Sequence, residues 1–566
     1  MKHYLLALGS VAAAALLAAC TDSAYDLSDI DSETEIKVNN LTVPVNMEAV
    51  KLSQVIDLKE GENLKVVDGR YAVLVEGSFS SDPIRINPIT IAAPVLNPTQ
   101  TTLNRLPDET RAAGMATFAV PATSSAFSYF DNDVDPSIKE ISVVKSDSYM
   151  ISLTLSAPAL QGVADEMHIE WIDFALPKGL TGTPSMGTYN KNNGQLSISD
   201  VTAASNGLTI TMPVTEIEAA KAGATLDPAT RTFIFDGTID VIDGRISVDI
   251  NKVPAGPVDL RIDYAMGELD VKSISGRIAY TVEDVNIPDV DLNDLPDFLR
   301  QDGTNVVLDN PQIYLSLENP MYSTRLTAST GLTLTAIRNG RPTVVCSLPN
   351  PIRAGADKGR GPYDFCLSPR EGDMLADYAQ AKYEPFPTLG HILEGQGLPE
   401  TIRIETVEPG FEEQNVTDLR IGYDYGTLEG SYTFYAPLSL EPGSTILYSD
   451  SDTGWGSEDL DKLTIETLTL TATAYSNVPA AVELTGDPLN YDGLAISTAT
   501  VSTVTIPANA QDYPVEITVT GPVDQLDGFL YKVKLTAGST ETLTPDQNLQ
   551  LTDIRATVSG KYVTNF

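Results

Sequence analysis

The chain has 566 residues, of which 42% are hydrophobic and 20% charged, a composition typical of a folded globular protein and not of a disordered one. Its formal net charge of −41 at pH 7 opposes binding to nucleic acid and to anionic lipid headgroups, so both are excluded as partners. The length is several times that of a usual single domain, and we expect three or four domains.

Residues 1–20, MKHYLLALGSVAAAALLAAC, predict export from the cytoplasm. Lys2 precedes an apolar run, Leu5–Ala19, that is too short to span a bilayer comfortably and is typical of a signal peptide. Small residues directly before Cys20 resemble a bacterial lipobox. The resemblance implies removal of residues 1–19 and attachment of a diacylglyceryl group to the Cys20 thiol. The alternative is an ordinary secretory signal that happens to contain a cysteine.

Residues 20–37 follow as an acidic tether without helical periodicity. About 16 residues at 3.3–3.6 Å each reach roughly 50–60 Å when extended. A lipidated Cys20 would carry two or more acyl chains, which is enough for stable anchoring. Because the rest of the chain is strongly negative, we expect the lipid to be its sole attachment to the membrane.

From about Val38 onward, apolar and polar residues alternate in short runs bounded by Gly, Asn, Asp or Pro. Such runs predict antiparallel strands with one buried face. The predicted fold class is mainly β, with tandem antiparallel β-sandwich domains and a few short helices. Clear strand candidates are Ile151–Leu155, Leu208–Met212, Ile246–Ile250, Ile313–Leu317 and Val515–Val519. The expected helices are Leu292–Arg300, Glu371–Lys382 and Thr388–Glu394.

An internal repeat suggests how the domains divide. Residues 259–269, DLRIDYAMGEL, and 418–428, DLRIGYDYGTL, are identical at seven of eleven positions with an offset of 159 residues. The match indicates a duplicated β domain, and the alternative is coincidence in a chain rich in Thr, Leu and Gly. The predicted division is a signal peptide at 1–19, a tether at 20–37, and β domains at 38–140, 141–265, 266–425 and 426–566. The last of these repeats part of the one before it.

Cys346 and Cys366 are the other cysteines of the chain. In an oxidising compartment we expect them to form a disulfide, and closing a loop of about 20 residues would contribute roughly 3 kcal/mol. Two buried thiols are the alternative. Zinc is excluded, because these cysteines and the two histidines of the mature chain, His168 and His391, lack ligand-like spacing.

The segment between these cysteines is locally basic, in contrast to the acidic chain as a whole. Arg353, Lys358 and Arg360 lie in the Gly- and Pro-rich stretch PNPIRAGADKGRGPYDF. Guanidinium groups bind carboxylate or phosphate in bidentate fashion, so a charged glycan, a lipopolysaccharide headgroup or the protein's own acidic surface could dock there. The alternative is a solvated loop whose charges only neutralise a neighbouring domain.

Asp450, Asp452 and Asp461 resemble part of an EF-hand-type calcium loop, as oxygen ligands at positions one, three and twelve. Gly454 stands at position five and Trp455 at position six, which departs from that pattern. Calcium is therefore the one candidate cofactor. Trp455, in a loop of Gly and Asp with little core to join, is also a candidate for stacking on a sugar ring.

Signs of catalysis are absent from the sequence. It has no G-x-S-x-G elbow, no H-E-x-x-H helix and no G-x-x-x-x-G-K loop. Seventy-seven acidic residues offer many carboxylate pairs, however, and spacing in sequence does not fix spacing in space. We therefore expect no enzyme, with a carbohydrate-active enzyme or its accessory glycan-binding module as the alternative.

The combination of a lipobox, an acidic tether and serial β domains resembles envelope lipoproteins of Bacteroidota. In that group an acidic stretch close behind the lipidated cysteine is associated with export to the outer face. The resemblance thus implies lipid anchoring in the outer membrane, with surface display favoured over the periplasmic face. Asp22-Ser23-Ala24 also matches the short O-glycosylation pattern of such bacteria, which implies a glycan on Ser23.

The leading hypothesis is a non-catalytic cell-envelope lipoprotein whose β-sandwiches bind a partner protein or glycan, or act as a structural spacer. A pilus-type anchor or tip subunit is a further alternative, because fimbrillin-type subunits are also β-sandwich lipoproteins. Their assembly generally needs cleavage at an arginine or lysine before the first strand. This chain has no arginine before Arg70, which disfavours that route.

Overall fold

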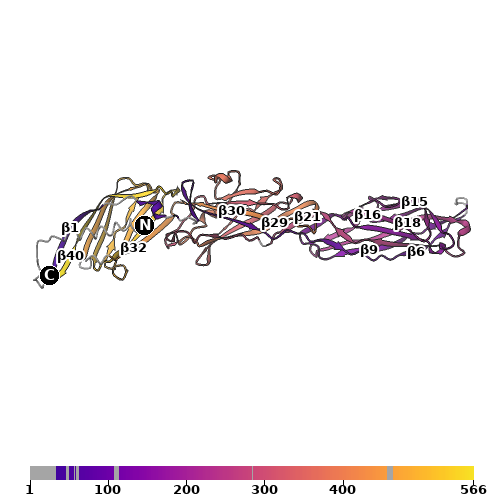
Figure 1. The fold of residues 1–566 in the computed structure, drawn as a ribbon, viewed down its shortest axis with the longest axis horizontal. Helices are drawn as coiled ribbons and strands as arrows, with labels where there is room; N and C mark the ends of the chain where they lie inside the picture. The colour runs from indigo at the N-terminus through magenta and orange to yellow at the C-terminus, as the bar shows by residue number, and fades with distance from the viewer. Residues whose placement is uncertain are drawn as a thin grey trace.

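The computed structural model describes residues 33–45, 50–56, 58, 63–107, 114–283, 285–454 and 463–565. Antiparallel strands dominate, and helices are few and short, so the predicted mainly β fold is confirmed. The strands form β-sandwiches that follow one another along an elongated molecule (Figure 1). We call them the distal, middle and proximal sandwiches.

The distal sandwich lies at the end of the molecule opposite to β1 and β40 (Figure 1). One sheet runs in the order β10 (Ile138–Lys145), β16 (Leu208–Glu218), β11 (Met150–Ser156), β19 (Asp259–Met266) and β6 (Thr99–Thr102). The other sheet contains β15 (Gln195–Ala204), β12 (Glu166–Ala175), β18 (Thr232–Asp249) and β8 (Met115–Val120), with β9 (Thr123–Asp131) also paired to β18. The apolar side chains of both sheets belong to one core cluster.

The middle sandwich is built in the same way. Its first sheet runs β25 (Arg341–Ser347), β24 (Ala328–Arg338), β29 (Thr401–Arg420) and β21 (Ser273–Thr281). Its second runs β28 (Lys382–Pro385), β27 (Tyr363–Ser368), β23 (Gln312–Leu317), β30 (Glu429–Pro437), β4 (Arg70–Ser80) and β3 (Leu64–Val67). Its core is continuous with that of the distal sandwich.

The proximal sandwich contains the strands from both ends of the described chain. One sheet runs β1 (Glu33–Val45), β40 (Asn548–Asn565), β33 (Leu463–Ser476), β37 (Tyr513–Val523) and β35 (Thr500–Val501). The other runs β32 (Thr445–Thr453), β38 (Gly528–Ala537), β34 (Ala480–Leu489) and β36 (Val504–Ile506).

The sandwiches are nested along the chain, which differs from the predicted row of consecutive domains at 38–140, 141–265, 266–425 and 426–566. The chain places β1 in the proximal sandwich and β4 in the middle one, and then builds the distal sandwich. It returns through the middle sandwich and ends in the proximal one, where β40 pairs with β1. Similarly, β4 pairs with β30, more than 300 residues further along. Local sequence carries no signal for such pairings.

The alternation in the sequence correctly locates the strands and their buried faces. In β12, for example, Met167, Ile169, Ile172 and Phe174 are at most 1% exposed, while the residues between them are half-buried. The predicted helices, however, shrink to short 3-10 turns. These turns are η4 (Asp297–Arg300), η6 (Ala376–Tyr378) and η7 (Pro387–His391). Pro296 lies inside the first predicted helix and stands at the N-cap of η4, so the turn begins only after it.

The two copies of the sequence repeat do not occupy equivalent strands. The first copy forms β19, which lies between β11 and β6, and then β20 (Leu269–Val271). The second begins at the end of β29, where it pairs with β21, and continues as the turn that leads into β30. Leu260 and Leu419 are nevertheless both fully buried, so the shared residues serve the core in each place.

Candidate functional site

Several residues singled out by the sequence lie outside the described residues, namely Cys20, Ser23, Trp455 and Asp461. Lipidation, glycosylation, sugar stacking and the last calcium ligand therefore stay predictions. In the part of the chain that the structure describes, no helix is long and apolar enough to cross a membrane.

Asp450 and Asp452 lie on β32 and not in a loop, which differs from the predicted EF-hand-type arrangement. Their backbones pair with Tyr531 and Phe529 of β38. The Tyr448 hydroxyl donates to Asp450 Oδ2 at 3.1 Å, and burial, together with this carboxylate, raises the tyrosine's pKa. Across the described ranges, no group of three or more His, Cys, Asp or Glu side chains is arranged to hold a metal ion.

The predicted disulfide between Cys346 and Cys366 is wrong, and the alternative of two buried thiols is what the structure contains. Cys346 lies on β25 and Cys366 on β27, in different sheets of the middle sandwich, and the two belong to separate core clusters. The Cys346 thiol donates to the Thr388 carbonyl at 3.0 Å. Burial raises the pKa of both thiols, and that of Cys366 to about 11.

The basic residues between the cysteines face the protein's own acidic groups. Arg353 pairs with Glu412, and Arg360 with Glu318 at 2.6 Å. The Lys358 ammonium lies 5.7 Å from the centre of a tyrosine ring. Of the three predicted binding partners, the protein's own acidic surface is therefore the one that these arginines contact. Both carboxylates are more than 40 residues away in sequence, so the spacing of the basic residues could not identify them.

The joint between the distal and middle sandwiches is a polar centre that the sequence did not reveal. The Asp135 side chain, in a residue only 6% exposed, accepts hydrogen bonds from the backbone N–H of Asn87 at 2.8 Å and of Ser137 at 2.9 Å. It also accepts one from the Ser137 hydroxyl at 2.6 Å. Asn87 belongs to the segment that enters the distal sandwich, and Asp135 and Ser137 lie just before β10. One carboxylate thus connects the entering chain to the start of β10.

Two further contacts connect the entering and returning chain at this joint. Arg85 forms an ion pair with Asp424 at 2.6 Å, and β5 (Ile89–Ile91) pairs with β20. In addition, β21 pairs on one side with β10 of the distal sandwich and on the other with β29 of the middle sandwich. The first sheet of the middle sandwich and the sheet from β10 to β6 of the distal sandwich are therefore parts of one sheet, which has twelve strands among the described residues.

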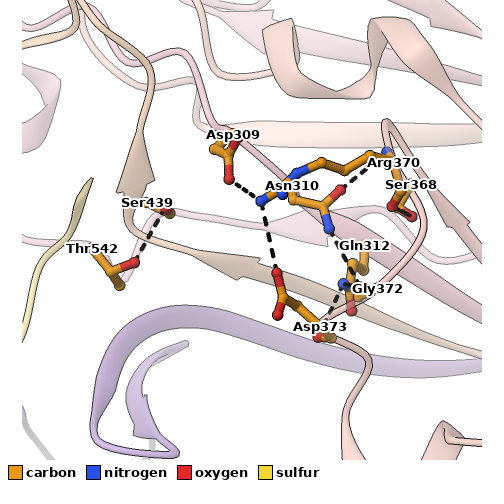
Figure 2. A network of polar contacts seen from close by, with 9 residues as sticks. All are labelled: Asp309, Asn310, Gln312, Ser368, Arg370, Gly372, Asp373, Ser439 and Thr542. Atoms are coloured by element: carbon orange, nitrogen blue, oxygen red, sulfur yellow. Dashed lines mark hydrogen bonds and ion pairs between the residues drawn. The ribbon is translucent and has the colours of Figure 1, made fainter. Parts of the chain in front are cut away.

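The joint between the middle and proximal sandwiches is also polar. Figure 2 shows Arg370 between Asp309 and Asp373, and Thr542 against Ser439. The last contact accompanies pairing of β31 (Ser439–Leu440) with β39 (Glu541–Thr542). The Thr542–Ser439 contact and the β31–β39 pairing connect the segment before β40 to the chain that leaves the middle sandwich, whereas the Arg370 ion pairs lie within the middle sandwich beside them.

A polar cavity of about 470 Å³ adjoins this second joint, lined in part by Arg70 and Tyr435. Gln312, which is 1% exposed, donates from Nε2 to the carbonyls of Gly372 and Asp373 at 3.0 and 3.1 Å (Figure 2). The Gln312 side-chain amide and the Arg370 guanidinium, which both line this cavity, therefore already have hydrogen-bond or ion-pair partners within the protein.

No protein-family model matches the chain, and no curated protein matches it. One similar solved structure is a protein from Parabacteroides distasonis with the provisional description of a secreted protein. It shares 11% identity over 51% of this chain and 89% of that chain, with a TM-score of 0.33. Another, described as the triple jelly roll fold and turret assembly in an archaeal virus, shares 11% identity over 84% and 91%, with a TM-score of 0.10. Both scores are too low for these likenesses to carry an argument.

Proposed function

We propose that this protein is a non-catalytic, lipid-anchored envelope protein that acts as a stiff spacer and holds its distal sandwich away from the membrane. The observation that carries the proposal is the nesting of the chain. Glu33, thirteen residues after the predicted lipidation site Cys20, lies in the proximal sandwich, and the inserted distal sandwich lies at the opposite end of the molecule (Figure 1). An anchor at Cys20 would therefore hold the molecule by one end.

The construction of the joints supports stiffness. Domains joined by a single linker are expected to move relative to one another unless their interface is large. Here the chain crosses each joint twice, once outward and once on its return. At the distal joint the sheet is also continuous, so bending there would break the backbone hydrogen bonds of β21.

Charge supports the same function. A formal net charge of −41 repels the molecule from anionic surfaces and from other copies of itself. A lipid anchor at one end and repulsion along the rest favour an orientation that points away from the membrane. Arg353 and Arg360 do not weaken this repulsion, because their charges are paired with Glu412 and Glu318 and do not form an open basic patch.

Stiffness can be tested with pairs of spin labels in the soluble Cys20→Ser protein. Lys37 on β1 and Lys252, beyond β18 at the distal end, are exposed and suit replacement by cysteine, whereas Cys346 and Cys366 are buried. We expect a Lys37→Cys/Lys252→Cys pair to give one narrow distance distribution by pulsed electron paramagnetic resonance.

The matched control is a Lys178→Cys/Lys252→Cys pair, because both of its labels lie in the distal sandwich. It measures the width that arises from the label side chains alone. A width for the long pair close to the control supports a stiff spacer. A distribution that is much broader, or that has several maxima, would overturn the proposal.

A further inference from the structure

The proximal sandwich contains an apolar cavity between its two sheets. The cavity has a volume of about 160 Å³, and thirteen of the sixteen described residues that line it are apolar. One wall is formed by residues such as Leu468, Leu470 and Ile517 of β33 and β37. The facing wall is formed by residues such as Leu484, Phe529 and Val533 of β34 and β38.

This cavity divides the core of the proximal sandwich. The distal and middle sandwiches share one continuous cluster of buried apolar residues. In the proximal sandwich this cluster reaches only the end next to the middle sandwich, at Ile446 and Ala537. The buried apolar residues around the cavity form two small clusters, one around Val515 and Ile554 and one around Ile465 and Val523. Residues of both clusters line the cavity, so it occupies the place where a continuous core would be expected.

The walls of the cavity are incompletely covered. β38 is a central strand with β32 on one side and β34 on the other, yet every residue from Phe529 to Thr536 is only half-buried. On β12, a central strand of the distal sandwich, the inward residues are fully buried. Protein interiors are normally packed as densely as organic crystals, and water does not fill apolar cavities well. An apolar occupant would complete this core.

The lining indicates the chemistry of that occupant. Sugars and nucleotides are held by several converging polar groups. The polar residues of this lining are Thr485, Tyr531 and Lys532, and the Lys532 ammonium is paired with Asp487 at 2.6 Å. Most of the remaining wall consists of branched aliphatic side chains, which pack well against methylene groups and offer no partner to a hydroxyl or a phosphate.

We propose that the proximal sandwich binds the end of one hydrocarbon chain, that of a single-chain lipid such as a fatty acid, between β33 and β37 on one side and β34 and β38 on the other. A cavity of about 160 Å³ suits a group of about six carbons, so the rest of the chain lies outside it. The end of the chain inserts among Leu470, Leu484 and Val533, and its polar head stays outside the cavity. This inference does not depend on the spacer function, because a flexible molecule could contain the same cavity.

The test is titration of the full-length Cys20→Ser protein with cis-parinaric acid, whose fluorescence rises in an apolar environment. We expect saturable binding of one probe per protein, reversed by palmitate. Leu484→Trp places an indole in the cavity and should weaken binding at least tenfold. Thr471→Trp is the matched control, because Thr471 lies on the opposite face of β33 from Leu470, and it should bind as the parent does.

Leu470→Phe is a second filling variant, for use if Leu484→Trp has no cooperative melting transition. Absence of saturable binding to the Cys20→Ser protein, or equal binding by a folded filling variant, would overturn the proposal. Comparison with the acylated protein identifies the source of the chain. If both forms bind the probe, the natural occupant is a separate lipid; if only Cys20→Ser binds it, an acyl chain on Cys20 already fills the cavity. Either result supports a hydrocarbon-chain site.

Discussion

Glu33, the first residue of β1, lies opposite Asn565, the last residue of β40, in an antiparallel pair that continues to Val45 and Ile554. The two ends of the described chain therefore lie side by side in one sheet. The chain between them travels to the distal sandwich and back. This closure explains why one molecule can contain three sandwiches in a row without a single-chain linker between any two of them.

Replacing the predicted lipidation site tests whether the anchor only tethers the protein. We expect Cys20→Ser to move the protein from the membrane fraction to the soluble fraction, with an unchanged melting temperature. The reason is that β1 begins thirteen residues later and is held by backbone pairing with β40, which needs no lipid. Fractionation and circular dichroism measure both properties. A soluble variant that melts much earlier than the acylated protein would contradict this expectation.

Removing the carboxylate at the distal joint should destabilise the protein. Asp135→Ala leaves the N–H groups of Asn87 and Ser137 without their acceptor in a buried place, and we expect a loss of about 1–3 kcal/mol in the free energy of unfolding. Asp133→Ala is the control. Asp133 forms an ion pair with Arg231, but its side chain is 80% exposed, so we expect about 0–1 kcal/mol. Urea denaturation followed by tyrosine fluorescence provides the comparison, and equal effects of the two variants would refute the role of Asp135.

The ion pair across the same joint predicts a pH dependence. The hydrogen bond from Arg85, followed by that from the Gly426 N–H, lowers the pKa of Asp424. A lowered pKa in the folded state gives stability that is present above the unfolded pKa of about 3.9 and is lost as the pH falls through the folded value. Asp424→Asn should therefore melt below the parent at pH 7, and the difference should shrink below pH 4.

The control for this pH series is Asp302→Asn, which changes an exposed carboxyl outside the joint. Its melting temperature should differ little from that of the parent at every pH. Differential scanning calorimetry between pH 3 and pH 7 measures all three proteins. If the difference in melting temperature between Asp424→Asn and the parent stays constant over this range, ionisation of Asp424 is not the source of the stabilisation.

The buried thiols predict slow modification. A thiol with a pKa of about 11, as for Cys366, is ionised in only about one molecule in a thousand at pH 8, and the thiolate is the reactive form. We expect the folded Cys20→Ser protein to react very slowly with Ellman's reagent. After unfolding without reductant, the protein should release two equivalents of thionitrobenzoate per chain, one for each free thiol. Release of none would demonstrate a disulfide between Cys346 and Cys366.

The candidate sites show that local sequence patterns do not predict which residues meet in the folded protein. The sequence correctly marks the segment around Arg353 and Arg360 as a reversal of charge, but it does not tell which anion they meet. Their partners Glu412 and Glu318 come from other strands that folding brings beside them. The disulfide prediction failed for the same reason, because two cysteines twenty residues apart end in different sheets.

The sequence by itself determined the strands of this protein. Side chains on a strand point alternately to its two faces. A strand with one buried face, such as β12 or β37, therefore shows alternating apolar and polar residues in the sequence. Only the tertiary structure decided which strands pair, that β1 meets β40 and β21 joins two sandwiches. Backbone hydrogen bonds between strands are nearly independent of side-chain identity, and the partners lie hundreds of residues apart. The nesting, the polar joints and the apolar cavity therefore follow from packing, which no local stretch of sequence records.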